Sequence, residues 1–397
     1  MNGKKIKLNI LLLLVILLSS GCSSSKQQPI LAVSNKSILN SANEINNFYE
    51  SMYVERNRNL RLDNSSKEES ADIEELVEYK GTVQHIFFHP LIIYPEKAFD
   101  GDYLSKGYND WFVTVYEFKK IIGSLYQKGY ILVDINDTFD TAEICGIKML
   151  VRKNLMIPKG KKPLIISIDD MNYYEYMISN GNANKLIIDD DGIVKTYSKD
   201  SNGQPVISND NDIVPILDNF INEHPDFSLN GAKGVIALTG YEGILGYRTN
   251  ELESPSYENE KQEAENLVNK LKSTGWTFAC HGYGHLDTND IDISRLMRDT
   301  NRWKSEVEPL IGPTSVYIYP FGSAVNYTDP KFKFLMDNGF DVFCGVGPET
   351  LTEYKKDCII TDRRPIDGIS MHNAKRLADL FDVNEVVDKV RPEKYGS

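Results

Sequence analysis

Three short segments place chemically active side chains directly after apolar runs. In LIISIDD, Asp169 and Asp170 leave a run typical of a buried strand. In FACHGYGHLD, His281 and His285 stand four residues apart, and the glycines between them disfavour a helix. In VYIYPFG, an apolar run ends in a Pro-Phe-Gly turn around Phe321. Each segment alone is compatible with a purely structural role, because a lone carboxylate often caps a helix and a lone His pair is often incidental.

Taken together, the three segments supply the donor set of a catalytic metal site. One carboxylate and two imidazoles provide three protein ligands and leave a fourth position open, as in catalytic zinc sites. The second carboxylate can then act as a general base toward water, and the Pro and Gly of the turn can aim a backbone N–H at a developing oxyanion. No Glu follows His281, so the HExxH protease mechanism is excluded. Two His and one carboxylate could also hold Fe(II) for an oxygenase, but that alternative gives the second Asp no role.

The elements that must position these residues alternate between apolar runs and amphipathic helices. A helix is predicted from Thr114, with Glu117 completing a capping box, and another from Asp329-Pro330. Repeated helix–Gly–strand units predict an α/β fold with about seven parallel strands, in a barrel or a doubly wound sheet. Functional residues gather at the C-terminal ends of the strands in both folds. The predicted strands are Val83–Phe88, Tyr130–Ile135, Leu164–Ile168, Val235–Thr239, Thr277–Cys280, Val316–Tyr319 and Phe340–Phe343.

The motifs SIDD, HGYGH and YPFG, in this order, resemble the first three motifs of polysaccharide deacetylases (carbohydrate esterase family 4, the NodB homology domain). The opening VQHIFFHPLI is similar to the first strand of extracellular members. The resemblance covers about residues 80–370. It implies a distorted (β/α) barrel of the NodB-homology type. It also implies metal-dependent hydrolysis of N-acetyl groups from an extracellular N-acetylhexosamine polymer, peptidoglycan or poly-N-acetylglucosamine, with release of acetate.

The resemblance assigns a role to each motif residue. Asp169 would be the general base, and the N–H of Phe321 would stabilise the oxyanion together with the metal. The residues that would hold a divalent metal, usually zinc with cobalt as a second choice, are Asp170, His281 and His285.

Two further roles follow from the same resemblance. The general acid would be His89, the early His of the first strand, with His372 as the competing candidate. A late Arg would lie beside the base, and TDRRPID offers Arg363 and Arg364 without deciding between them.

Three residues depart from the family pattern. Met171 stands where Gly is usual, Gly282 replaces a Ser or Thr of the His motif, and Ile318 stands in place of the first Arg of the third motif. The first two departures leave open a catalytically inactive surface lipoprotein that binds carbohydrate. A third alternative is an amidase or esterase with a small substrate.

Two segments outside the motifs carry weaker signals. KLIIDDDGIVKTY, within residues 177–212, predicts a β-hairpin, because the acidic spacing and closing Glu of a calcium loop are missing. Residues 240–249 form either a mobile loop or a sugar-contacting rim that uses Tyr241, Tyr247 and Arg248.

The N-terminus predicts export. Residues 1–21 combine lysines with the apolar run Ile10–Leu18, which is too short to span about 30 Å of hydrocarbon and indicates a signal peptide. Small residues before Cys22 resemble a bacterial lipobox, so lipid on Cys22 would anchor the protein to the outer face of a bacterial membrane. Without that lipid, the protein would be secreted.

The remaining boundaries come from composition. We predict a partly helical stalk over 22–79, a catalytic domain over 80–375, and a C-terminal helix and tail over 376–397. The net charge of −13 over 397 residues argues against a nucleic-acid partner. Four cysteines remain after Cys22 without a disulfide or zinc pattern, and Cys280 and Cys344 are predicted to be buried.

Overall fold

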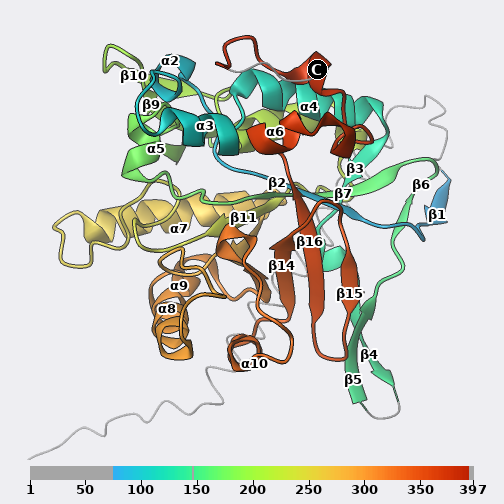
Figure 1. Ribbon diagram of the computed structural model, residues 1–397. Coiled ribbons are helices and arrows are strands. Elements are labelled where there is room, and N and C mark those ends of the chain that lie inside the picture. Colours follow the sequence, from blue (N-terminus) through green and yellow to red (C-terminus); the bar gives the residue numbers. More distant parts are fainter. Residues whose placement is uncertain (1–74, 145–146, 393–397) are drawn as a thin grey trace, which may run out of the picture. The chain divides into compact units, whose positions relative to one another are not determined.

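A computed structural model describes residues 75–144 and 147–392. Seven parallel strands close into a barrel, because β7 pairs with both β2 and β11, and β16 pairs with β2 (Figure 1). The predicted α/β barrel of about seven parallel strands is therefore confirmed. In order around the barrel the strands are β2 (Gln84–Phe88), β7 (Lys162–Ile168), β11 (Val235–Leu238), β12 (Thr277–Cys280), β13 (Val316–Ile318), β14 (Val342–Val346) and β16 (Ile359–Pro365).

One predicted strand lies outside the closed ring, and one ring strand was not predicted. The run after Gly129 forms β3 (Tyr130–Leu132), which pairs with the first residues of β7 and forms one bridge from Leu132 to Ser228. The unpredicted ring strand is β16, whose sequence IITDRRP lacks a continuous apolar run. Its polar residues include a buried arginine inside the barrel, so apolar content could not reveal it. The strand β15 (Thr352–Tyr354) pairs antiparallel with β16.

Apolar side chains fill both faces of the barrel wall. Small and branched residues pack inside, among them Ile165, Ala237 and Ile318. A larger cluster packs between the outer face of the strands and the surrounding helices. The main helices are α4 (Val115–Gln127), α6 (Ile213–Glu223), α7 (Tyr257–Ser273), α8 (Ile293–Glu306) and α10 (Pro330–Asp337).

The predicted helix starts and the hairpin are confirmed. Thr114 and Glu117 form the capping box of α4, and the Asp329 side chain caps α10. The predicted hairpin forms from β8 (Lys185–Ile188) and β9 (Val194–Lys199), with β10 (Pro205–Ser208) as a third antiparallel strand.

Smaller elements surround the barrel. Figure 1 shows the hairpin of β4 and β5 next to β15. The small strands are β1 (Leu76–Glu78), β4 (Phe139–Ile144), β5 (Ile147–Arg152) and β6 (Met156–Pro158). The short helices are α2 (Pro95–Ala98), α3 (Ser105–Trp111), α5 (Glu175–Ser179), α9 (Glu308–Ile311), α11 (Gly368–His372) and α12 (Val383–Val386).

The folded region extends past both predicted domain boundaries. β1 belongs to the predicted stalk, yet it pairs with β6. At the other end, the guanidinium of Arg391 is buried against Glu117 of α4. The predicted signal peptide and the lipid site at Cys22 lie outside the described residues. No helix within the described ranges is long and apolar enough to cross a membrane. Cys280 and Cys344 are buried, as predicted.

Candidate active site

The three sequence motifs meet at the C-terminal end of the barrel. Asp169 and Asp170 directly follow β7, His281 and His285 follow β12, and Phe321 follows β13. All five residues line one cavity of about 370 Å³. The parallel barrel therefore brings together residues that are more than 150 positions apart in the chain.

Three of these side chains can share one metal ion. The ligand atoms of Asp170, His281 and His285 all lie within 4.8 Å of one another. The two carboxylate oxygens of Asp170 lie 3.9 Å from His281 Nε2 and 3.6 Å from His285 Nε2. His281 Nδ1 lies 2.8 Å from the carbonyl oxygen of Ile318, which can only accept, so Nδ1 carries the proton and Nε2 keeps a free lone pair. This donor set fits a divalent metal such as zinc.

The charges of these groups also suit a metal. Burial acts to raise the pKa of Asp170, but His285 and His281 outweigh burial and hold the pKa below its usual range. Burial lowers the pKa of His281 more than the neighbouring carboxylates raise it. An ionised carboxylate and a neutral imidazole are the protonation states that metal ligands require, and each pKa shift is in the direction that favours that state.

A buried tyrosine positions the carboxylate of Asp170. The hydroxyl of Tyr174 donates to Asp170 Oδ1 at 2.7 Å and lies 2.6 Å from Thr239 Oγ1. Because the single phenolic proton goes to the carboxylate, the Thr239 hydroxyl must donate to Tyr174. Asp170 itself has a φ of 59°, a left-handed conformation that few residues other than Gly adopt. The hydrogen bond fixes one oxygen and leaves the other free for a ligand.

The turn that carries both histidines is held by Asp299 of α8. Its two carboxylate oxygens accept from the backbone N–H groups of Tyr283 and Gly284, at 2.7 and 2.8 Å. Gly282 has a φ of 66°, and a Cβ there would lie 3.2 Å from Asp299 Oδ2. The Gly at this position therefore suits the turn. No local sequence signal identifies Asp299, which lies fifteen residues beyond Gly284.

The other carboxylate, Asp169, is paired with an arginine. Arg363 donates from Nη1 to Oδ1 at 2.7 Å and from Nη2 to Oδ2 at 2.9 Å, and both side chains are buried. Burial acts to raise the pKa of Asp169, but Arg363 and His281 outweigh it and hold the pKa well below its usual range. Arg364 instead pairs with Asp379 at 2.7 Å. The arginine beside the candidate base is thus Arg363.

The two candidate general acids differ in position. His89 follows β2, lines the cavity, and has Nδ1 3.1 Å from the carbonyl oxygen of Trp111. His372 ends α11 and is exposed outside the residues that line the cavity. The geometry therefore favours His89 over His372.

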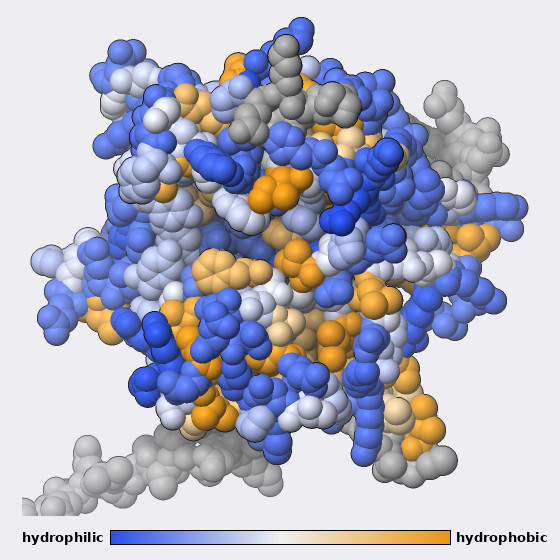
Figure 2. Space-filling model, in the orientation of Figure 1, coloured by the Kyte–Doolittle hydropathy of each residue, from blue (hydrophilic) through white to orange (hydrophobic). Residues whose placement is uncertain are grey.

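Exposed apolar side chains surround the cavity. Figure 2 shows separate apolar patches on an otherwise largely hydrophilic face of the molecule. Those at the cavity include Phe321 and Trp111, which are 68% and 51% exposed. The remaining exposed members are Tyr176, Val346 and Ile369. Such a mouth can contact the apolar faces of sugar rings.

The predicted sugar-contacting rim on residues 240–249 does not form as a unit. Tyr247 is buried, so its expected role in that rim is wrong. The guanidinium of Arg248 binds Glu175 and the carbonyl of Glu242. Tyr241 stacks on Tyr174, with ring centroids 4.6 Å apart. Through Tyr174, Tyr241 therefore packs next to the side chain that hydrogen-bonds to Asp170.

Comparisons with known proteins find similarity only among solved structures. No protein-family model and no curated protein matches the chain. It is similar to a polysaccharide deacetylase from Bacillus cereus, at 14% identity and a TM-score of 0.41 over 76% of this chain and 69% of that one. For the Streptococcus pyogenes deacetylase PplD in complex with acetate, the identity is 13% and the TM-score 0.41, over 77% of this chain and 100% of that one. For IcaB from Ammonifex degensii, the identity is 9% and the TM-score 0.37, over 72% of this chain and 92% of that one. TM-scores this low carry no functional assignment, which therefore rests on the site.

Proposed function

We propose that the protein is a metal-dependent N-deacetylase that releases acetate from an N-acetylhexosamine polymer. One observation carries the proposal. An ionised carboxylate, Asp169, is held by Arg363 beside a cluster of three metal ligands in the same cavity. A structural ion pair would not require the three ligands, and a simple metal site would not require the second carboxylate.

The protein's own residues would divide the reaction as follows. A divalent metal held by Asp170, His281 and His285 would supply Lewis-acid chemistry. Asp169 takes a proton from the attacking water, and Arg363 keeps its carboxylate oriented. The N–H of Phe321 faces the oxygen that gains charge.

Cleavage of the carbon–nitrogen bond also needs a proton donor. His89 gives a proton to the leaving nitrogen, so that a free amine and acetate depart. Its contact with Trp111 fixes the ring at the cavity mouth.

Neither of the two departures from the family pattern that suggested an inactive protein removes a side chain to which the proposed chemistry gives a role. Met171 is fully buried in the apolar core, and Gly282 suits the turn that Asp299 holds. We therefore favour an enzyme over a carbohydrate-binding lipoprotein. The exposed mouth favours a polymer, with peptidoglycan and poly-N-acetylglucosamine as candidates. Lipid on Cys22 would place the enzyme at the outer face of a bacterial membrane.

The test is acetate release from N-acetylglucosamine oligomers of increasing length and from peptidoglycan. The protein without residues 1–21 is supplied with zinc or cobalt, and the Asp169→Asn variant is the matched control. We expect release that needs metal, increases with oligomer length, and disappears in the variant. A metal-loaded wild type that releases no acetate from any of these polymers would refute the proposed function.

A further inference from the structure

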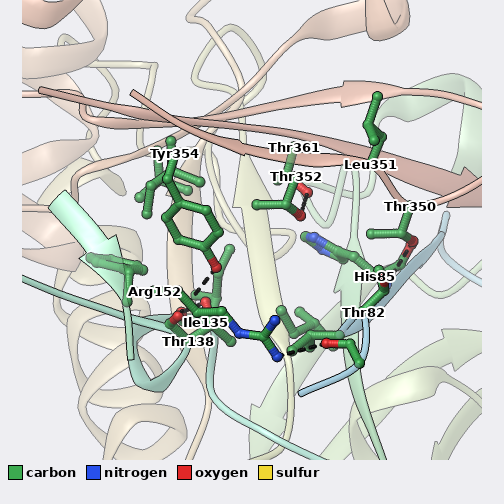
Figure 3. A pocket seen from close by; sticks show the side chains of 16 residues that line it. Thr82, His85, Ile135, Thr138, Arg152, Thr350, Leu351, Thr352, Tyr354 and Thr361 are labelled. Atoms are coloured by element: carbon green, nitrogen blue, oxygen red, sulfur yellow. Dashed lines mark hydrogen bonds between the residues drawn. The ribbon is translucent and has the colours of Figure 1, made fainter. Parts of the chain in front are cut away.

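A second cavity lies at the opposite end of the barrel, where the strands begin. Its volume is about 160 Å³, and Figure 3 shows its lining. His85 near the start of β2, Ile165 of β7, and Ile359 and Thr361 of β16 face it. No described residue lines both this basal cavity and the candidate active site.

The basal cavity contains a buried imidazole with one unused nitrogen. His85 is 1% exposed, and its Nδ1 has no hydrogen-bond partner among the described residues. Its Nε2 lies 3.1 Å from Ser167 Oγ, which already accepts from Arg363 Nη1 at 3.0 Å. The Ser167 hydroxyl therefore donates its proton to His85 Nε2, which accepts, so the single N–H of the neutral ring is at Nδ1. The basal cavity thus receives an N–H donor that lacks an acceptor.

Other groups at the basal cavity also have donors to spare. Arg152 donates from Nη1 and Nη2 to three backbone carbonyls, and its Nε–H has no partner within the described ranges. Thr352 and Thr361 share one hydrogen bond of 2.9 Å, so one of the two hydroxyl protons remains available. Figure 3 shows these hydroxyls beside the ring of His85.

The lining contains no opposing negative charge. None of the 16 described residues around the basal cavity is Asp or Glu, although the whole chain has a net charge of −13. An acceptor-rich anion can therefore lie between Arg152 and His85 without meeting a carboxylate. Apolar side chains form the rest of the wall: Val83, Ile135, Ile165, Val342 and Ile359.

We propose that the basal cavity binds a small monocarboxylate with a short aliphatic chain. The carboxylate accepts from His85 Nδ1 and from Arg152, and the aliphatic chain packs on the apolar wall. A cavity of about 150 Å³ can hold a molecule as large as benzene, so the volume of the basal cavity suits an ion of propionate size. The hydrogen bonds from His85 through Ser167 and Arg363 continue to Asp169, so the bound ion would lie at the far end of a polar chain that reaches the candidate base.

The test is calorimetric titration of the metal-free protein with propionate and with its uncharged isostere propionamide. We expect propionate to bind one per chain, and propionamide to bind at least about tenfold more weakly because it lacks the charge that Arg152 recognises. Saturable binding of both with equal affinity would overturn the proposal. Absence of any saturable propionate binding would mean that the basal cavity holds only water, and would overturn it too.

Four variants locate the binding site. Arg152→Gln, on an exposed side chain, and His85→Phe, which keeps an aromatic ring, should each weaken propionate binding at least about tenfold. Arg298→Gln, on an exposed arginine of α8, should leave it unchanged. His285→Ala should also leave it unchanged, because that residue belongs to the other cavity. Binding that survives both Arg152→Gln and His85→Phe, or that is lost in His285→Ala, would contradict the assignment. Thermal unfolding of each variant confirms that the comparison is made on folded protein.

Discussion

Two buried arginine–carboxylate pairs look alike but differ in their surroundings. Arg363 pairs with Asp169 inside the barrel, and Arg391 pairs with Glu117 at the start of α4. Each pair has two charge-assisted hydrogen bonds, and no member's side chain is more than 5% exposed.

Their neighbours separate the two pairs. Glu117 also accepts from the backbone N–H of Thr114 and of Asp388, so this pair joins the C-terminal segment to a helix cap. Asp169 instead lies 4.0 Å from His281 Nε2 and lines the cavity that holds the metal ligands. A buried ion pair is therefore not by itself a sign of catalysis. The imidazoles beside it and the access to a cavity are what distinguish the Arg363–Asp169 pair.

Removing one of the imidazoles beside the Arg363–Asp169 pair should have the largest effect. In His281→Ala only two of the three metal ligands remain, so we expect metal content to fall from one ion per chain to near zero and acetate release to stop. Elemental analysis of folded, gel-filtered protein measures the metal. Glu117→Gln, at the other pair, should keep its metal. Full metal stoichiometry in His281→Ala would show that the ligand assignment is wrong.

The next largest effect concerns the proton donor at the cavity mouth. His89→Gln should lower the rate of acetate release by about 10²–10⁴-fold, the usual contribution of a general acid, with metal content unchanged. His372→Gln should retain the wild-type rate, because His372 lies outside the residues that line the cavity. Rates measured under single-turnover conditions give the comparison. A loss confined to His372→Gln would reverse the assignment.

Breaking each pair should separate stability from catalysis. Arg363→Met and Arg391→Met both leave a buried carboxylate without its partner, and each should cost about 3–5 kcal/mol of unfolding free energy. Urea unfolding at neutral pH checks this.

Only the first substitution should change the pH dependence of the rate. In the wild type Asp169 has a depressed pKa, so it stays ionised as pH falls, and the stability it contributes is lost only as pH falls through that low value. Without Arg363, burial loses its largest opposing influence, so the pKa of Asp169 rises and the acidic side of the pH–rate profile should move to higher pH. A profile that moves equally in Arg391→Met would remove the distinction between the pairs.

The smallest expected effect is at Phe321. Its φ of 59° is unfavourable for a residue with a Cβ, so Phe321→Gly should relieve about 1–2 kcal/mol of strain while it keeps the backbone N–H. The rate should fall far less than the about 10²–10³-fold expected when an oxyanion donor is lost. Steady-state kinetics measures this. A loss of that larger size would show that the phenyl ring, which lies 4.4 Å from the His285 ring, is the group that matters.

Local patterns in the sequence predicted much of the fold. The Thr114–Glu117 capping box, the hairpin over β8 and β9, and six of the seven barrel strands follow from spacing within a few residues. The sequence also predicted that the strand-end carboxylates and histidines meet in one site, because functional residues gather at the C-terminal ends of parallel strands. The strand β16 was missed because four of its seven residues are polar, including the buried Arg363 inside the barrel.

Other parts of the site depend on contacts that no short window of sequence contains. Asp299 accepts hydrogen bonds from the histidine turn although it lies on α8. The hydroxyl of Tyr174 donates to Asp170, but nothing in the segment MNYYEYM distinguishes this tyrosine from its neighbours. Arg363 and Arg364 are adjacent and chemically identical. Their side chains point to opposite faces of β16, and this alone decides which one reaches Asp169. These positions require the closed barrel.

The most direct test of the site compares its two neighbouring carboxylates in one experiment. Metal content and acetate release are measured on the same preparations of wild type, Asp169→Asn and Asp170→Asn. If Asp169 is the base and Asp170 a metal ligand, Asp169→Asn keeps one metal per chain and releases no acetate, whereas Asp170→Asn loses both. Acetate release at the wild-type rate from Asp169→Asn, or full metal content in Asp170→Asn, would contradict these roles.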